Sequence, residues 1–78
     1  MEILLKESKM VEVFKTNVEQ PGHSAMLIDQ LISHIPNSEI NFDLEDCDKI
    51  LRIEAESVSN QIIIEILHQN GYQAEVLI

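Results

Sequence analysis

Two kinds of hydrophobic periodicity alternate along this chain, and their order limits the folds open to it. Four segments place apolar residues at every second position, as strands with one buried face do: 10–18, 40–44, 49–55 and 74–78. Two further segments, 21–35 and 59–70, carry apolar residues at helical spacing. The pattern therefore predicts the order strand, helix, strand, strand, helix, strand.

The ends of both predicted helices carry recognisable signals. Pro21 suits the first turn of the first helix, whose core stripe is Leu27, Leu31 and Ile35, and Pro36 ends it. The second helix has Ser59 as its predicted N-cap and Gly71 at the position just past its C-terminus. Its predicted buried face consists of Ile62, Ile63, Ile66 and Leu67.

The brief polar break at 45–48 predicts a hairpin between the second and third strands. The complete order, βαββαβ, is that of the ferredoxin-like α+β fold, in which two helices pack on one face of a four-stranded antiparallel sheet. With 78 residues there is room for one domain, which we expect to span 10–78. Residues 1–9 fall outside this plan and are predicted to form an N-terminal extension, either a tail or a strand that lengthens a sheet edge.

The net charge and the cysteine content indicate which kinds of partner and which cellular compartment to expect. Fourteen acidic residues against five basic ones give a formal net charge of −9. This charge repels phosphates and anionic lipids, so we expect neither nucleic-acid nor membrane binding, whereas a basic protein surface or a cation is favoured. The chain contains no apolar run near the roughly 18 residues of a membrane span. A single cysteine, Cys47, cannot form a disulfide within the chain, and we expect a cytoplasmic location.

Segment 11–77 also carries the features of a known family. Leu27 and Leu31 follow a strand and a loop, Pro36 precedes the second strand, and the run 70–77 reads Asn-Gly-Tyr-Gln-Ala-Glu-Val-Leu. In these features the chain resembles heavy-metal-associated domains, the fold of small copper chaperones and of the N-terminal modules of copper-transporting ATPases, which end in a similar Gly-Tyr-x-Ala sequence. The resemblance implies the ferredoxin-like fold and, for intact members, metal transfer.

The metal-binding motif of that family is absent. The family places Gly-Met-x-Cys-x-x-Cys at the end of the first strand, and the corresponding positions here are 17–23, with Gln20 and His23 where the cysteines stand. Cu(I) is a soft ion that favours thiolates, and neither a glutamine amide nor a single imidazole holds it. We therefore expect a degenerate member of the family with no metal, no cofactor and no catalytic residue.

A substitute metal site is the alternative. In the predicted topology the first two strands run parallel, so the loop at 18–23, the hairpin at 45–48 and the loop holding Tyr72 emerge at one end. His23 and Cys47, with neighbouring carboxylates, would offer ligands that suit Zn²⁺, Ni²⁺ or Cu²⁺. The carboxylates concerned belong to Glu19, Glu45, Asp46 and Asp48. An acidic hairpin tip is ordinarily a solvated turn, and no close ligand pair such as Cys-x₂-Cys supports the site.

Enzymatic readings find little support. His23 and Ser24 are adjacent, but no pattern suggests an oriented triad, and the single arginine, Arg52, lies mid-strand without a phosphate-binding loop. Phe14, Phe42 and Tyr72 are too few aromatic residues for an RNA-binding sheet. A small-molecule sensor of the ACT kind shares the topology but would need a glycine-rich first loop. The sequence thus favours a non-enzymatic protein-interaction or regulatory module that binds a protein partner or a second copy of itself.

Overall fold

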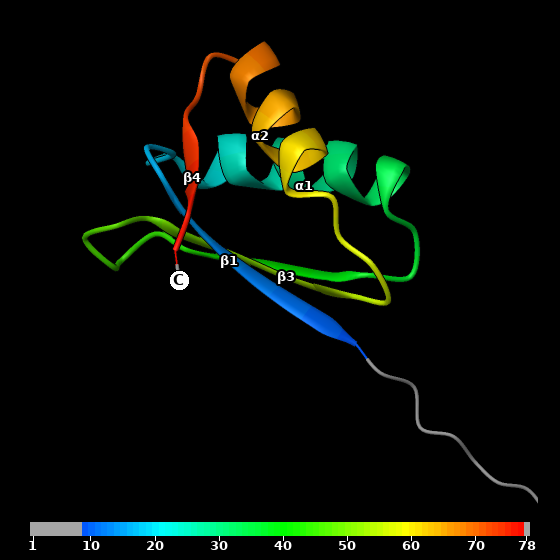
Figure 1. The fold of residues 1–78 in the computed structure, drawn as a ribbon. Helices are drawn as coiled ribbons and strands as arrows, with labels where there is room; N and C mark the ends of the chain where they lie inside the picture. The colour runs from blue at the N-terminus through cyan, green and yellow to red at the C-terminus, as the bar shows by residue number, and fades with distance from the viewer. Residues whose placement is uncertain (1–8, 78) are drawn as a thin grey trace, which may run out of the picture.

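The computed structural model describes residues 9–77 as an α+β structure with the predicted order of elements (Figure 1). The strands and helices are β1 (Met10–Thr16), α1 (Pro21–His34), β2 (Glu39–Asp43), β3 (Ile50–Ala55), α2 (Asn60–Gln69) and β4 (Ala74–Val76). Most of the predicted extension, residues 1–8, lies outside the described residues, as does Ile78 at the end of the last predicted strand.

The predicted four-stranded antiparallel sheet is confirmed. Its strand order is β2-β3-β1-β4, and every neighbouring pair is antiparallel. Phe14 in β1 lies opposite Leu51 in β3 and Val76 in β4. The register shows that β4 pairs with only the last three residues of β1, whereas β3 pairs with β1 along five positions. The edges of the sheet are therefore β2 and the shorter β4.

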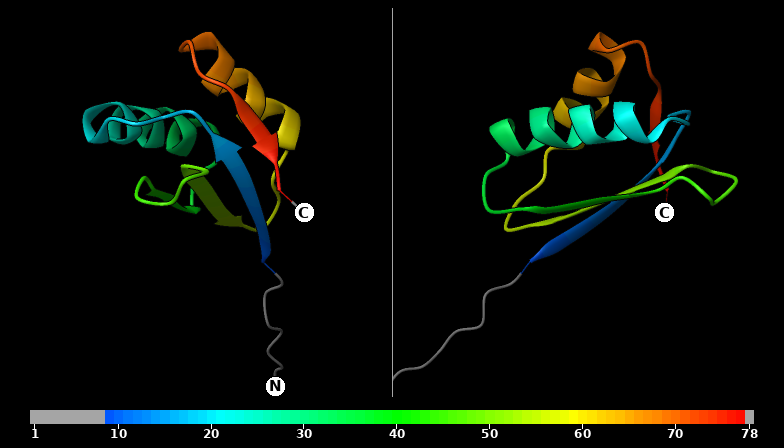
Figure 2. Two further views of the ribbon diagram at one scale, coloured as in Figure 1. Left: turned by 90° about the vertical axis from the view of Figure 1, so that its left-hand side faces the viewer. Right: turned by 180° about the vertical axis from the view of Figure 1, so that it is seen from behind.

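One hydrophobic cluster joins the sheet to both helices. The two helices lie next to each other in both views of Figure 2, α1 also contacts β2, and α2 contacts β4. The buried members of the cluster are Phe14, Val18, Leu27, Leu31, Ile40, Leu51, Ile53, Ile63, Ile66 and Leu67. The predicted inward positions Leu27, Leu31, Leu51 and Ile53 are confirmed.

The prediction that Ile62 belongs to the buried face of α2 is wrong. Its side chain is 44% exposed, whereas Ile63 is fully buried. Each helical residue is rotated about 100° from the one before it, because a turn contains 3.6 residues. By this geometry the centre of the face formed by Ile63, Ile66 and Leu67 lies about 90° around the helix from Ile62. Ile63, Ile66 and Leu67 share the buried face, and Ile62 lies to one side of it.

Both predicted signals at the ends of α2 are confirmed. The Ser59 hydroxyl accepts a hydrogen bond from the N–H of Ile62 at 3.5 Å. At the other end Gly71 has a φ of 87°, and its N–H donates to the carbonyl of His68 at 3.0 Å. The N–H of Tyr72 donates to the carbonyl of Leu67 at 2.9 Å. These two bonds form a Schellman motif, which satisfies carbonyls that the helix itself leaves free.

Within residues 9–77, neither helix has the length and apolar character that crossing a bilayer requires.

Candidate functional site

The candidate site is the end of the molecule where three connecting segments meet: 17–20, 44–49 and 70–73. The N–H of Thr16 donates to the carbonyl of Asp48 at 3.0 Å, which joins the end of β1 to the β2–β3 turn. The N–H of Gln73 donates to Asn17 Oδ1 at 2.8 Å, which joins the same loop to the segment before β4. The loops predicted to share one end of the molecule are thus in direct contact.

Gln20 and His23, the two residues singled out in the sequence, lie where α1 begins. Gln20 is the N-cap residue, and its carbonyl accepts bonds from the N–H groups of His23 and Ser24, both at 3.0 Å. Its side chain makes no capping hydrogen bond. The His23 ring instead reaches across to the α2–β4 segment, where Nδ1 hydrogen-bonds the hydroxyl of Tyr72. The His23 imidazole therefore already has a hydrogen-bond partner.

Thr16 holds the β1–α1 loop against the β2–β3 turn. It is the buried polar residue of the core, 6% exposed. Its hydroxyl donates to the carbonyl of Lys49 at 2.6 Å and accepts from the N–H of Val18 at 3.2 Å. The sequence pattern does not indicate this link, because the partner Lys49 is 33 residues away along the chain.

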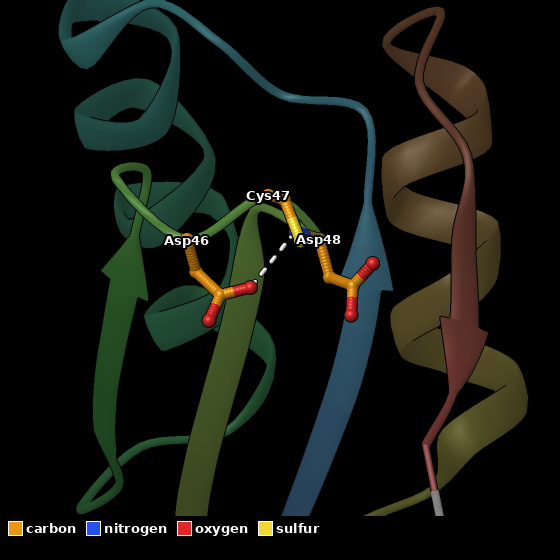
Figure 3. Close-up of side chains that lie close together, drawn as sticks. All are labelled: Asp46, Cys47 and Asp48. Atoms are coloured by element: carbon orange, nitrogen blue, oxygen red, sulfur yellow. Dashed lines mark hydrogen bonds between the residues drawn. The ribbon is translucent and has the colours of Figure 1, made fainter.

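The β2–β3 turn is fixed by its own hydrogen bonds. Asp46 Oδ1 accepts from the N–H of Asp48 at 2.8 Å, the bond drawn in Figure 3, and the Asp46 carbonyl accepts from the N–H of Lys49 at 3.0 Å. Lys49 has a φ of 46°, and its ammonium group donates to the carbonyl of Leu44 at 3.0 Å. Cys47 is exposed at the tip of this turn.

Three ligand groups come together in this turn. One ligand atom from each of Asp46, Cys47 and Asp48 lies within 4.8 Å of the other two (Figure 3). Within residues 9–77 the structure brings three or more potential metal ligands together at this turn and at no other place. His23 does not belong to the group. Glu19 and Glu45 are also outside it. Asp48 Oδ1 lies 3.9 Å from the ammonium of Lys15, a cation that competes with any metal ion for this carboxylate.

The structure does not join Ser24 and His23 into a nucleophile and base. The Ser24 hydroxyl donates to the carbonyl of Pro21 at 2.8 Å, while the His23 ring bonds Tyr72. Arg52, the single arginine, lies 3.5 Å from Glu54 on the same strand. The Ser24 bond is typical of the first turn of a helix, and the Arg52–Glu54 pair is typical of the exposed face of a strand.

Two hollows flank the domain. A cavity of about 420 Å³ lies beside β4 at the candidate end; it is lined by Lys15, Thr16, Asn17, Ile64, His68, Tyr72, Gln73, Ala74 and Glu75. A second, of about 300 Å³, lies where α1 ends and α2 begins; it is lined by His34, Ile35, Pro36, Glu56, Ser57, Ser59 and Ile62.

No family model, no curated protein and no solved structure matches this chain.

Proposed function

We propose that this chain is a non-enzymatic protein-interaction or regulatory module, built on a ferredoxin-like domain related to heavy-metal-associated domains. The order βαββαβ supports the fold, as does a sheet in which β1 and β3 are the central strands. We further propose that both helices cover one face of the sheet. Support comes from the alternation of burial, since Phe14 and Thr16 in β1 lie opposite buried or partly buried residues of β3 and β4.

The observation that carries the functional proposal is the contrast between the core and the β1–α1 loop. The core is continuous from sheet to helices, while the loop offers Gln20 and His23 at the two thiolate positions of the family. His23 makes a hydrogen bond to Tyr72 in place of a metal contact. A domain that keeps its packed core but lacks the metal ligands can still act by binding other molecules at its surface.

The charge of the chain indicates the class of partner. A net charge of −9 on a domain of 78 residues attracts basic surfaces over distances of about 10 Å at 0.1 M salt. We infer that the partner is a basic protein in the cytoplasm, where a single exposed thiol such as Cys47 stays reduced.

The test is direct binding. Folded, tag-free chain is coupled to a support through its N-terminal amine, which leaves Cys47 and the turn around it unmodified, and exposed to lysate of the source cell. Each protein retained is then purified and titrated against the free chain by calorimetry at 50 and 200 mM salt. We expect saturable binding by a basic protein that weakens with salt. If no purified candidate binds in the titration, the interaction function is wrong.

Self-association is the other form of this proposal, and sedimentation distinguishes it. A second copy carries the same charge of −9, so mutual repulsion opposes pairing at low salt. If the chain sediments as a monomer at high concentration, self-association is wrong and the proposed function is binding to a basic protein.

The alternative function is metal binding with substitute ligands. The group formed by Asp46, Cys47 and Asp48 is the observation that favours it, with His23 outside this group in the first turn of α1. Calorimetric titration with Zn²⁺, Ni²⁺ and Cu²⁺, alongside Cys47→Ser, decides this point. Tight, stoichiometric binding that Cys47→Ser abolishes would establish the alternative in place of the interaction module.

A further inference from the structure

We propose that the outer edge of β2 binds an extended, basic segment of the partner protein, which adds a fifth strand to the sheet. This inference rests on the proposed interaction function and specifies its surface and its ligand. Strand addition joins an extended peptide to a free sheet edge through main-chain hydrogen bonds, while alternate side chains supply specificity. Two features of β2 lead to this proposal: its open backbone and its exposed acidic side chains.

The outer edge of β2 has free backbone donors and acceptors. In the sheet β2 has β3 as its neighbour, and no strand within residues 9–77 pairs with its other side. The N–H of Leu77 donates to the carbonyl of Val13 at 2.8 Å, so the odd-numbered residues of β1 direct their backbone groups toward β4. The even-numbered residues of β1 then face β3, where they pair with odd-numbered residues, so the even-numbered residues of β3 face β2. These pair with the odd-numbered residues of β2. The backbone N–H and C=O groups of Ile40 and Phe42 therefore point away from β3, toward the outer edge.

The side chains of β2 divide into an apolar and an acidic row. Ile40 and Phe42 belong to the hydrophobic cluster or pack against it, while Glu39, Asn41 and Asp43 are exposed on the opposite face. A strand added to this edge would place every second side chain beside the apolar row. Its other side chains would lie opposite Glu39, Asn41 and Asp43, at Cβ separations of about 5 Å.

The acidic row lacks cations of its own. Glu39 lies directly opposite Glu54 in β3, and the nearby Arg52 forms its ion pair with Glu54 at 3.5 Å. Within the described part of the chain no ion pair involves Glu39 or Asp43. Like charges facing each other across strands are destabilising, so a basic residue opposite Glu39 would relieve an unfavourable pair as well as form a favourable one.

The same charges select the occupant. Two copies of β2 paired antiparallel would bring Glu39 of one copy beside Asp43 of the other, which repels a second copy. The β4 edge is a poorer site, because it has three residues and its Glu75 lies opposite Lys15. A basic extended segment is therefore the ligand whose charges match β2.

The geometry gives the ligand a sequence pattern. Basic residues four positions apart lie opposite Glu39 and Asp43, a polar residue lies opposite Asn41, and β-branched residues lie beside Ile40 and Phe42. A suitable probe is the capped heptapeptide Gly-Arg-Val-Thr-Val-Arg-Gly. Its two valines are the residues that would exchange main-chain hydrogen bonds with β2.

The experiment measures amide hydrogen exchange of the ¹⁵N-labelled chain with and without this peptide. At 90% saturation we expect the amides of Ile40 and Phe42 to exchange about tenfold more slowly, since exchange then proceeds from the unbound tenth of the molecules. A peptide carrying N-methyl groups on both valines should lose this protection. Binding that leaves the exchange of Ile40 and Phe42 unchanged would overturn the proposal.

Charge reversal supplies the matched comparison. Glu39→Lys/Asp43→Lys should weaken peptide binding about tenfold or more, the size expected for a reversed pair at a close contact. Glu65→Lys/Glu75→Lys changes the net charge by the same amount at exposed positions on α2 and on β4, the opposite edge of the sheet, and should leave most of the binding in place. Equal weakening by the two double variants would show a general charge effect and overturn the edge site.

The outcome with the natural partner separates the two proposals. If a purified partner binds the chain equally well after Glu39→Lys/Asp43→Lys, the interaction function stands and the edge site is wrong. If neither partner nor peptide binds, both are wrong. A homodimer that the same substitutions strengthen would identify a second copy as the occupant and exclude the basic segment.

Discussion

At the scale of single residues, the two glycines of this chain have opposite roles. Gly71 adopts a φ of 87° at the end of α2, a conformation that side chains with a Cβ rarely take, while Gly22 lies in the first turn of α1. A Cβ would meet nothing within 4 Å at either site. The backbone conformation alone therefore decides the effect of an added methyl group at each position.

We expect Gly71→Ala to lower the free energy of unfolding by about 1–2 kcal/mol, the cost of a left-handed L-residue. Gly22→Ala should raise it by about 0.4–1 kcal/mol, because alanine reduces the freedom of the unfolded chain. Urea unfolding followed by circular dichroism measures both. Two changes of the same sign would contradict the assignment of these roles.

Thr16 is the buried polar link between the sheet and the candidate end. Thr16→Val keeps the shape but leaves the carbonyl of Lys49 and the N–H of Val18 without their side-chain partner. We expect a loss of about 1–3 kcal/mol of stability, the cost of unsatisfied buried groups. Urea titration measures the loss, and Thr16→Ser, which keeps the hydroxyl, serves as the control. A valine variant as stable as the original would show that these bonds contribute nothing.

Several residue roles were predictable and others were not. Ser59 and Gly71 were predicted because helix caps depend on neighbours only a few residues away. The bonds of Thr16 to Lys49, of His23 to Tyr72 and of Asn17 to Gln73 were not, since each joins residues more than 30 positions apart. The proximity of Asp46, Cys47 and Asp48 follows from their place in one short turn, whereas the position of His23 depends on how α1 packs against the rest of the chain.

At the scale of elements, the start of α2 depends on one side chain. Ser59 satisfies the free N–H of Ile62, although at 3.5 Å the bond is long. We expect Ser59→Ala to cost about 0.5–1 kcal/mol, the lower part of the range for such caps. Chemical denaturation measures the cost, with the exposed neighbour Ser57→Ala as the control. A larger loss in the Ser57 variant would place the cap elsewhere.

The type and order of the helices and strands could be predicted from the spacing of apolar residues, because each element buries one of its faces in the core. The exposure of Ile62 did not, since a run of three isoleucines fits a helical stripe in more than one rotation. The register of Ile63 on the core is set by contacts with the sheet, which no local pattern contains. For the same reason the start of β4 was not predictable: Ala74 begins the strand because it pairs with Thr16, the last residue of β1.

At the scale of the whole molecule, excess negative charge opposes compactness. The radius of gyration is 13.3 Å, and the Debye length falls from about 30 Å at 0.01 M salt to about 8 Å at 0.15 M. Charges across the whole domain therefore repel one another at low salt and are screened at physiological salt.

We expect the melting temperature to rise by about 4–8 °C between these two NaCl concentrations, which corresponds to about 1 kcal/mol for a domain of this size. Thermal unfolding by circular dichroism measures the shift. Replacing four exposed glutamates, Glu19, Glu45, Glu65 and Glu75, by glutamine should reduce it. A melting temperature that falls with added salt would mean that the surface ion pairs outweigh the net repulsion.

The four-stranded antiparallel sheet and two helices were predictable because few arrangements bury six one-sided elements of this order. The function was less accessible. The free backbone groups of Ile40 and Phe42 became visible only with the strand order and register.

The position of Cys47 has a practical consequence. It is the single thiol of the chain, it is exposed, and it lies in the turn that directly follows β2. A maleimide dye can therefore be attached at one defined point of the unaltered sequence. Its fluorescence emission would change when a molecule binds along the neighbouring strand β2. The chain thus carries a natural labelling position close to the surface where we expect its partner.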